Sequence, residues 1–217
     1  MGRFLLPIYE FTNQSFLRVF IIVAILNLIS TLIYNHLVWT ELVYLNEVGL
    51  KIPDDNFKKG SVSRFWISMT VDFISPLWLM VKVGLVCGLI YLVAYMLDLV
   101  VVPSELMKSI LTSYLFVVFG DLIYSVILLF FDPPLVKNDI LYYYPLSVLG
   151  FIDSNSEFLK FYFIWSRINF FQLLFIFSLY YLFRTQHKLS IKNSIFLTVS
   201  YILFYGLFLV FWLFVSV

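Results

Sequence analysis

Long apolar runs separated by short polar stretches make up most of the chain. A bilayer core about 30 Å thick takes about 20 consecutive apolar residues of helix to cross. We therefore predict a single all-α integral membrane domain over residues 1–217, a polytopic bundle of five transmembrane helices plus interfacial helices. The five predicted spans lie at 18–39, 76–102, 109–131, 161–183 and 191–217.

Two further apolar segments are not expected to cross the membrane. Pro76 interrupts the long apolar stretch that begins at Phe65, and the residue before a proline is pushed away from helical geometry. We therefore expect an interfacial helix at 65–75, followed by the second span. Another apolar piece, at 140–152, contains Pro145 and is too short to span, so we expect it to lie in or dip into the interface.

Composition excludes a water-soluble fold. Hydrophobic residues make up 62% of the chain and charged residues 12%. Soluble domains carry about 25% charged residues, so the charge here is too sparse to cover a globule, and the surplus apolar surface is expected to face the lipid bilayer. A net charge of +1 gives no field that would recruit nucleic acid. The single cysteine, Cys87, cannot form an internal disulfide.

Charged and aromatic residues predict the orientation in the membrane. An odd number of spans places the two termini on opposite sides. Basic residues are equally numerous on the two sides but denser in the shorter N-terminal-side loops, which favours a cytoplasmic N-terminus and a non-cytoplasmic C-terminus. Tryptophans favour the membrane–water boundary, and in this arrangement all of them fall towards the non-cytoplasmic side. They are Trp39, Trp66, Trp78, Trp165 and Trp212.

One acidic residue, Asp121, falls near the middle of a predicted span. An ionised carboxylate there is costly and usually pairs with a cation or lines a path. We predict an intramembrane ion pair between Asp121 and Arg167 that ties the third and fourth spans together, with Lys82 as the alternative partner. Two other interpretations stay open. In the first, Asp121 is protonated and hydrogen-bonded, while both cations reach towards the interface. In the second, the three residues serve an ion or proton pathway.

Two glycines one turn apart, Gly84 and Gly88, form a candidate helix-packing motif on the second span. Residues without a Cβ let two helices approach closely. The alternative is that these small residues are incidental, because so short a pattern arises often by chance in apolar runs.

Catalytic motifs are absent from the sequence. It contains no G-x-S-x-G, no H-E-x-x-H and no phosphate-binding glycine loop. His36 and His187 belong at opposite membrane faces in the predicted topology and cannot share a metal ion. Asp72 and Asp98 lie near span boundaries, where we expect hydration and no chemistry. We therefore predict no catalytic site, no cofactor and no metal.

The part of the chain from about residue 104 to the end resembles the YIP-domain family, the Ypt/Rab-interacting proteins and their bacterial relatives. The segments that carry the resemblance are Pro103–Lys108, Pro145–Gly150, Ile168–Leu173 and His187–Ser190. The resemblance implies a non-enzymatic five-span membrane protein with a cytoplasmic N-terminus that acts through contacts with other membrane components. Together with the high Phe, Ile, Asn and Lys content, it favours a bacterial inner (cytoplasmic) membrane.

These observations favour a scaffold or accessory subunit of a larger membrane complex, whose partners are the bilayer and other integral membrane proteins. The alternative is a transporter or channel component that uses Asp121, Arg167 and Lys82. A lipid-modifying enzyme is a third possibility, but it needs a reactive polar cluster that these residues do not supply. The sequence identifies no soluble small-molecule substrate.

Overall fold

Four helices of the computed structural model are long and apolar enough to cross a membrane. The structure describes residues 9–38, 55–130, 146–148 and 162–216, and its helices confirm the all-α prediction for these residues. The four long helices are α2 (Phe16–Leu32) with its continuation η1 (Ile33–Val38), α4 (Asp55–Met96), α5 (Pro103–Leu129) and α9 (Ile191–Ser216). Two shorter helices, α7 (Tyr162–Arg167) and α8 (Phe170–Thr185), lie between α5 and α9 in the sequence.

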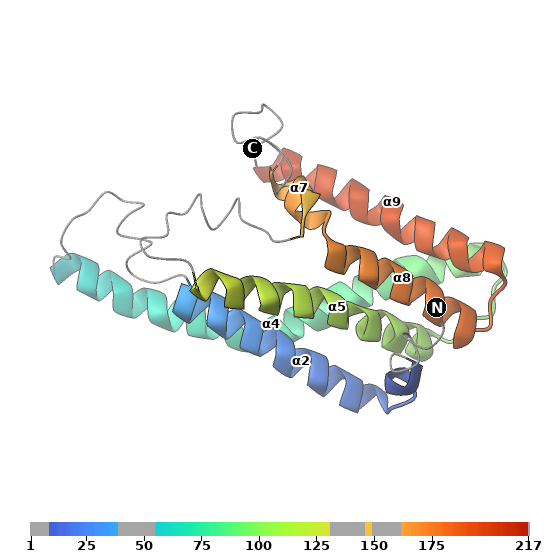
Figure 1. Cartoon of the computed structure of the whole chain (residues 1–217), viewed down its shortest axis with the longest axis horizontal. Helices are drawn as coiled ribbons and strands as arrows, with labels where there is room; N and C mark the ends of the chain where they lie inside the picture. The colour runs from blue at the N-terminus through green and yellow to red at the C-terminus, as the bar shows by residue number, and fades with distance from the viewer. Residues whose placement is uncertain (1–8, 39–54, 131–145, 149–161, 217) are drawn as a thin grey trace.

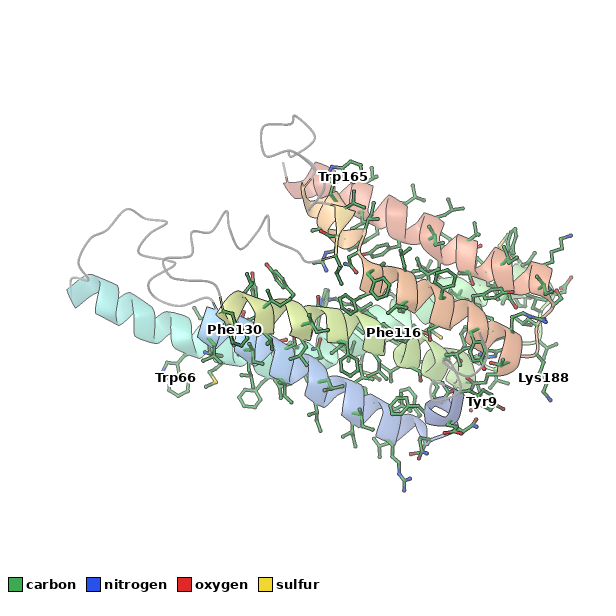
Figure 2. All side chains as sticks on the ribbon, viewed as in Figure 1. Tyr9, Trp66, Phe116, Phe130, Trp165 and Lys188 are labelled. Atoms are coloured by element: carbon green, nitrogen blue, oxygen red, sulfur yellow. The ribbon has the colours of Figure 1, made fainter. Side chains whose placement is uncertain are left out.

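Helix α5 lies at the centre of the bundle (Figure 1). It contacts α2 and α4 on one side and α8 on the other, while α9 packs against α4 and α8. Helices α2, α4 and α5, the pair α7–α8, and α9 alternate in direction along the long axis, so Tyr9 and the C-terminal end of α9 lie at opposite ends of the bundle (Figures 1 and 2).

The bundle has apolar residues both inside and outside. Its core contains Val19, Val83, Ile110, Phe175 and Leu197, each no more than 2% exposed. Large apolar side chains also point outwards from every long helix. Helices that are apolar on all sides suit the interior of a membrane, and we therefore describe the chain as a multi-pass membrane protein.

The second predicted span differs from the helix that the structure contains. Helix α4 runs without a break through Pro76, so the prediction of a separate interfacial helix at 65–75 is wrong. Apolar membrane helices tolerate proline because neighbouring groups satisfy the freed backbone. The helix also ends at Met96, before the predicted boundary at 102, and Asp98 adopts a left-handed conformation with φ of 53°.

The fourth predicted span, 161–183, is not one helix but two. Helices α7 and α8 are separated at Ile168 and Asn169, where the backbone of Asn169 is extended. Asn169 forms an isolated antiparallel bridge with Ser147, in which the Val148 N–H donates to the Ile168 carbonyl at 2.9 Å. Five continuous spans are therefore not observed in the described part of the chain. The rest of the predicted interfacial piece at 140–152 lies outside the described residues.

Candidate functional site

The break between α7 and α8 lies against α5 beside Asp121. Gly120 precedes Asp121, and a Cβ placed on Gly120 would lie 2.7 Å from the ring of Phe171, in the first turn of α8. Only glycine allows this approach, because Cβ atoms in proteins do not come so close to a neighbouring ring. The α5–α8 crossing therefore brings Asp121 of α5 close to the irregular backbone between α7 and α8.

The three ionisable residues predicted from the sequence come from three different helices around this break. Arg167 is the last residue of α7, Asp121 lies on α5 and Lys82 on α4. The charges of Asp121 and Arg167 both act on the Lys82 ammonium group, so the three lie within electrostatic range of one another. The Lys82 Nζ also lies 5.9 Å from the centroid of the Trp78 ring. Direct pairing of Asp121 with Arg167 stays a prediction.

The predicted packing motif at Gly84 and Gly88 meets no second helix in the described part of the chain. Among the described residues, no heavy atom lies within 4 Å of a Cβ built on either glycine. The packing role of Gly84 and Gly88 therefore stays a prediction. Among the described glycines, Gly120, which was not singled out from the sequence, is the one whose Cβ position meets a second helix.

A second polar cluster joins α2 to α4 and was missed by the sequence analysis. Asp72 on α4 is buried, with 1% of its side chain exposed. Its Oδ1 accepts a hydrogen bond of 2.6 Å from Asn35 Nδ2, and its Oδ2 lies 2.7 Å from His36 Nε2. One helical turn along, Asn27 Nδ2 donates to Ser75 Oγ at 3.2 Å. These three contacts, two to Asp72 and one to Ser75, make a polar seam between the two helices.

Backbone irregularities on both helices accompany this seam. Asn35 and His36 belong to η1, a π-helical turn, and such turns occur often at functional sites. On α4, Pro76 lacks the N–H that would bond to the carbonyl of Asp72 four residues earlier. The signal in the sequence was the pair of adjacent polar residues Asn35 and His36 within an apolar run. The burial of Asp72 was not predicted, because this residue lies near a boundary of a predicted span.

A third cluster, which we call the polar clasp, joins the start of α5 to the turn between α8 and α9. It consists of Glu105, Lys108, Ser109, Gln186 and His187. Gln186 Nε2 donates to Glu105 Oε2 at 2.6 Å, and Lys108 Nζ lies 3.0 Å from the same oxygen. The buried Ser109 Oγ lies 2.9 Å from Gln186 Oε1 and 3.0 Å from His187 Nε2.

Donor counting fixes the tautomer of His187 in the polar clasp. The Ser109 hydroxyl has one proton, and both the Glu105 carbonyl and Gln186 Oε1 are acceptors at 2.9 Å. His187 Nε2 therefore donates to the Ser109 oxygen, which leaves Nδ1 to accept a proton. Burial lowers the pKa of the His187 imidazole, and the Glu105 carboxylate opposes this shift by raising the pKa. The imidazole is thus neutral at physiological pH.

The chemistry available in these clusters is mainly hydrogen bonding between helices. Within the described part of the chain, no three residues of the types His, Cys, Asp and Glu are grouped so that they could hold a metal ion. His36 and His187 belong to different clusters, and Ser109 is fully buried beside its histidine. Comparison with protein-family models, with curated proteins and with solved structures finds no match for this chain. The resemblance to the YIP-domain family therefore stays a prediction.

Proposed function

We propose that the chain is a non-enzymatic integral membrane protein that acts as a scaffold or accessory subunit of a larger membrane complex. Its partners on this proposal are other integral membrane proteins, which it contacts through the apolar surfaces that its helices present outwards. The proposed location is a bacterial inner membrane with the N-terminus in the cytoplasm. The basic residues of the α8–α9 turn support this orientation, because short cytoplasmic loops are enriched in Lys and Arg.

The observation that carries this proposal is that polar side chains inside the bundle bind one another across helices. Asp72 joins α4 to η1. On the other side of α5, Ser113 Oγ donates to Ser178 Oγ at 3.1 Å. Gln172 Nε2 donates to the Tyr201 hydroxyl at 3.0 Å. Contacts of this kind fix the helices relative to one another, as a scaffold requires, and leave the outer apolar surface for binding.

Copurification tests the proposal. A tagged chain extracted in a mild detergent is expected to elute with other membrane proteins at a mass well above its own 25.6 kDa plus detergent. The matched control is a variant in which Phe73 and Leu77, both exposed on the outer face of α4, are changed to Ala. This variant should keep the fold. It should lose the partners that bind this face. Elution of the unaltered chain alone, at monomer mass, would contradict the proposal.

A transporter or channel component is the second candidate, and the broken helix favours it. Secondary transporters form their substrate and ion sites with discontinuous helices. Non-helical backbone at membrane depth is tolerated where it is buried in protein or lines a water-filled cavity. In this chain the break at Ile168 lies beside Asp121 and directly after Arg167.

Cysteine accessibility distinguishes the two candidates. In a Cys87→Ser background, Asp121→Cys should react with a water-soluble thiol reagent if a hydrated pathway reaches this position. Phe119→Cys is the matched control, because Phe119 lies two residues away on the same helix but is exposed on the outer surface of the bundle. Equal protection of both cysteines would exclude the pathway and leave the scaffold proposal.

A further inference from the structure

A shallow groove of about 570 Å³ runs along the first part of α9. Its lining consists of one cationic residue and four apolar residues, namely Lys192, Ile191, Ile195, Phe196 and Val199. These positions recur at a helical spacing and therefore share one face of α9. They extend over about 12 Å at 1.5 Å per residue.

The groove faces away from the rest of the protein. The opposite face of α9 packs into the bundle through Leu197, Thr198 and Tyr201, which are no more than 8% exposed. Ile195 and Phe196, by contrast, are about half exposed, at 48% and 50%. In a membrane-spanning helix, such an outward apolar groove lies in contact with lipid chains.

Positive charge is concentrated where the groove meets the membrane surface. Lys192 stands at the start of α9, and Lys188 lies in the turn that precedes it. From residue 186 to 217 the sequence contains no aspartate or glutamate. The Glu105 carboxylate, which reaches this turn from α5, is already bound by Gln186 and Lys108. Lys192 at the mouth of the groove is therefore not neutralised by any acidic residue between 186 and 217.

We propose that the groove binds one acyl chain of a phospholipid with an anionic headgroup, whose phosphate lies against Lys192. The apolar stripe of Ile195, Phe196 and Val199 accommodates the upper part of the chain directly beneath the headgroup. Basic residues at the cytoplasmic surface attract anionic lipids by about 1 kcal/mol each. The site rests on the proposed orientation, in which α9 spans the membrane and begins at the cytoplasmic surface. It does not depend on whether the chain acts as a scaffold or in transport.

Lipid titration of the purified full chain tests this site. The probes are dioleoyl phosphatidylglycerol, which is anionic, and dioleoyl phosphatidylcholine, which is zwitterionic, and native mass spectrometry counts the lipids retained per chain. We expect one phosphatidylglycerol to bind about fivefold more tightly than phosphatidylcholine, because one lysine at the surface contributes about 1 kcal/mol to the binding of an anionic lipid. Lys192→Gln should remove this preference. Ile195→Trp fills the groove and should abolish retention of both lipids.

The control is Arg18→Gln, which removes an exposed cation from the same end of the bundle but from α2 rather than α9. It should leave the preference for phosphatidylglycerol unchanged. Thermal unfolding without added lipid should be the same for all variants, because the altered side chains point outwards. Equal binding of the two lipids by the unaltered chain, equal losses in the Lys192 and Arg18 variants, or undiminished retention by the Ile195 variant would each overturn the site.

Discussion

Asp72 shows how strongly a single polar residue can act in an apolar bundle. Its position near a predicted span boundary suggested hydration, yet only 1% of its side chain is exposed and both carboxylate oxygens contact η1. A buried carboxylate is retained only when it is hydrogen-bonded or paired. Asn35 and His36 supply those contacts, so the three residues act as one unit that holds the end of α2 against α4.

Replacement of Asp72 by Asn should destabilise the protein. The amide preserves the shape but removes the charge, and hydrogen bonds to charged groups contribute about 1.5–3 kcal/mol each. We expect a loss of about 2 kcal/mol in the free energy of unfolding, measured by denaturation in detergent. Asp98→Asn is the control, because Asp98 is exposed and asparagine tolerates its left-handed backbone. Equal stability of the two variants would contradict this account of Asp72.

Gly120→Ala should be destabilising although alanine is the better helix former. The added methyl group would lie 2.7 Å from the Phe171 ring, and overpacking of this kind costs about 1–3 kcal/mol. Gly84→Ala is the matched control, since no described heavy atom lies within 4 Å of its Cβ, and it should be neutral or slightly stabilising. A smaller side chain, as in Phe171→Leu, should recover part of the Gly120→Ala loss. The free energy of unfolding in detergent is compared for the unaltered chain, Gly84→Ala, Gly120→Ala and the double variant Gly120→Ala with Phe171→Leu. A double variant no more stable than Gly120→Ala would argue against this contact.

At the scale of elements, the helices are joined by polar contacts concentrated at specific ends and crossings. The polar clasp holds the start of α5 against the turn between α8 and α9, and Arg184 donates a further hydrogen bond to the Leu189 carbonyl within that turn. The seam at Asp72 lies towards the other end of the bundle. The three ionisable residues around the α7–α8 break come between these two clusters. Each cluster ties elements that are far apart in the sequence.

The polar clasp should weaken on acidification. Because the pKa of His187 is lowered in the folded protein from 6.5, the unfolded chain binds the proton more tightly. The stabilising contribution is therefore fully present above pH 6.5 and is lost as the pH falls through that value towards the folded pKa. The charged residues of the polar clasp and its turn are Glu105 and Lys108 on α5, Arg184 on α8 and Lys188 next to His187 in the sequence. Of these, Glu105 raises the pKa of His187 and so opposes the effect of burial.

Unfolding of the unaltered chain and of His187→Gln, measured between neutral pH and about pH 5, isolates this contribution. Acidification changes other groups in both proteins, so the informative quantity is the difference between the two. The unaltered chain should lose its advantage over the variant as the pH falls. A difference that stays constant over this range would contradict the proposed role of His187.

Exchange of charges tests the pairing around the helix break. Asp121→Arg and Arg167→Asp should each lower the yield of folded protein, because each leaves like charges together in a medium of low dielectric constant. The double variant restores opposite charges and should recover most of the yield of folded protein. This yield is measured as the amount of monodisperse protein in detergent. Asp121→Lys combined with Lys82→Asp tests the alternative partner in the same way. Recovery in neither pair would mean that Asp121 does not form an ion pair with these cations.

For the whole molecule, hydropathy predicted which parts of the chain enter the membrane but not how the backbone passes through it. The apolar runs at 109–131 and 191–217 correspond closely to α5 and α9, since length and polarity decide the existence of such helices. The break at Ile168 was not predictable in this way, because it depends on a backbone bridge to Ser147 in a remote segment. Likewise, the burial of Asp72 depends on two residues of another helix. Clusters formed between distant segments leave no periodic pattern in either segment.

The broken pair α7–α8 decides whether the chain crosses the membrane an odd number of times. Among the described residues, four helices are long enough to cross by themselves, and four crossings alone would place both ends of the chain on one side. In the structure Tyr9 and Lys188 lie at one end of the bundle, whereas Phe130 and Trp165 lie at the other (Figure 2). The pair therefore runs from the end that carries Trp165 to the end that carries Lys188. That this run is a fifth passage through the membrane stays a prediction.

Site-directed labelling should show this passage directly. In a Cys87→Ser background, Asn13→Cys and Lys188→Cys should react with a membrane-impermeant reagent from the same side, and Phe130→Cys from the opposite side. All three positions are exposed, so differences in labelling report membrane sidedness and not burial. If Lys188→Cys were labelled together with Phe130→Cys, α7 and α8 would enter and leave on one face. The irregular backbone at Ile168 would then be the tip of a re-entrant segment, and Asp121 and Arg167 could not tie two spanning helices together.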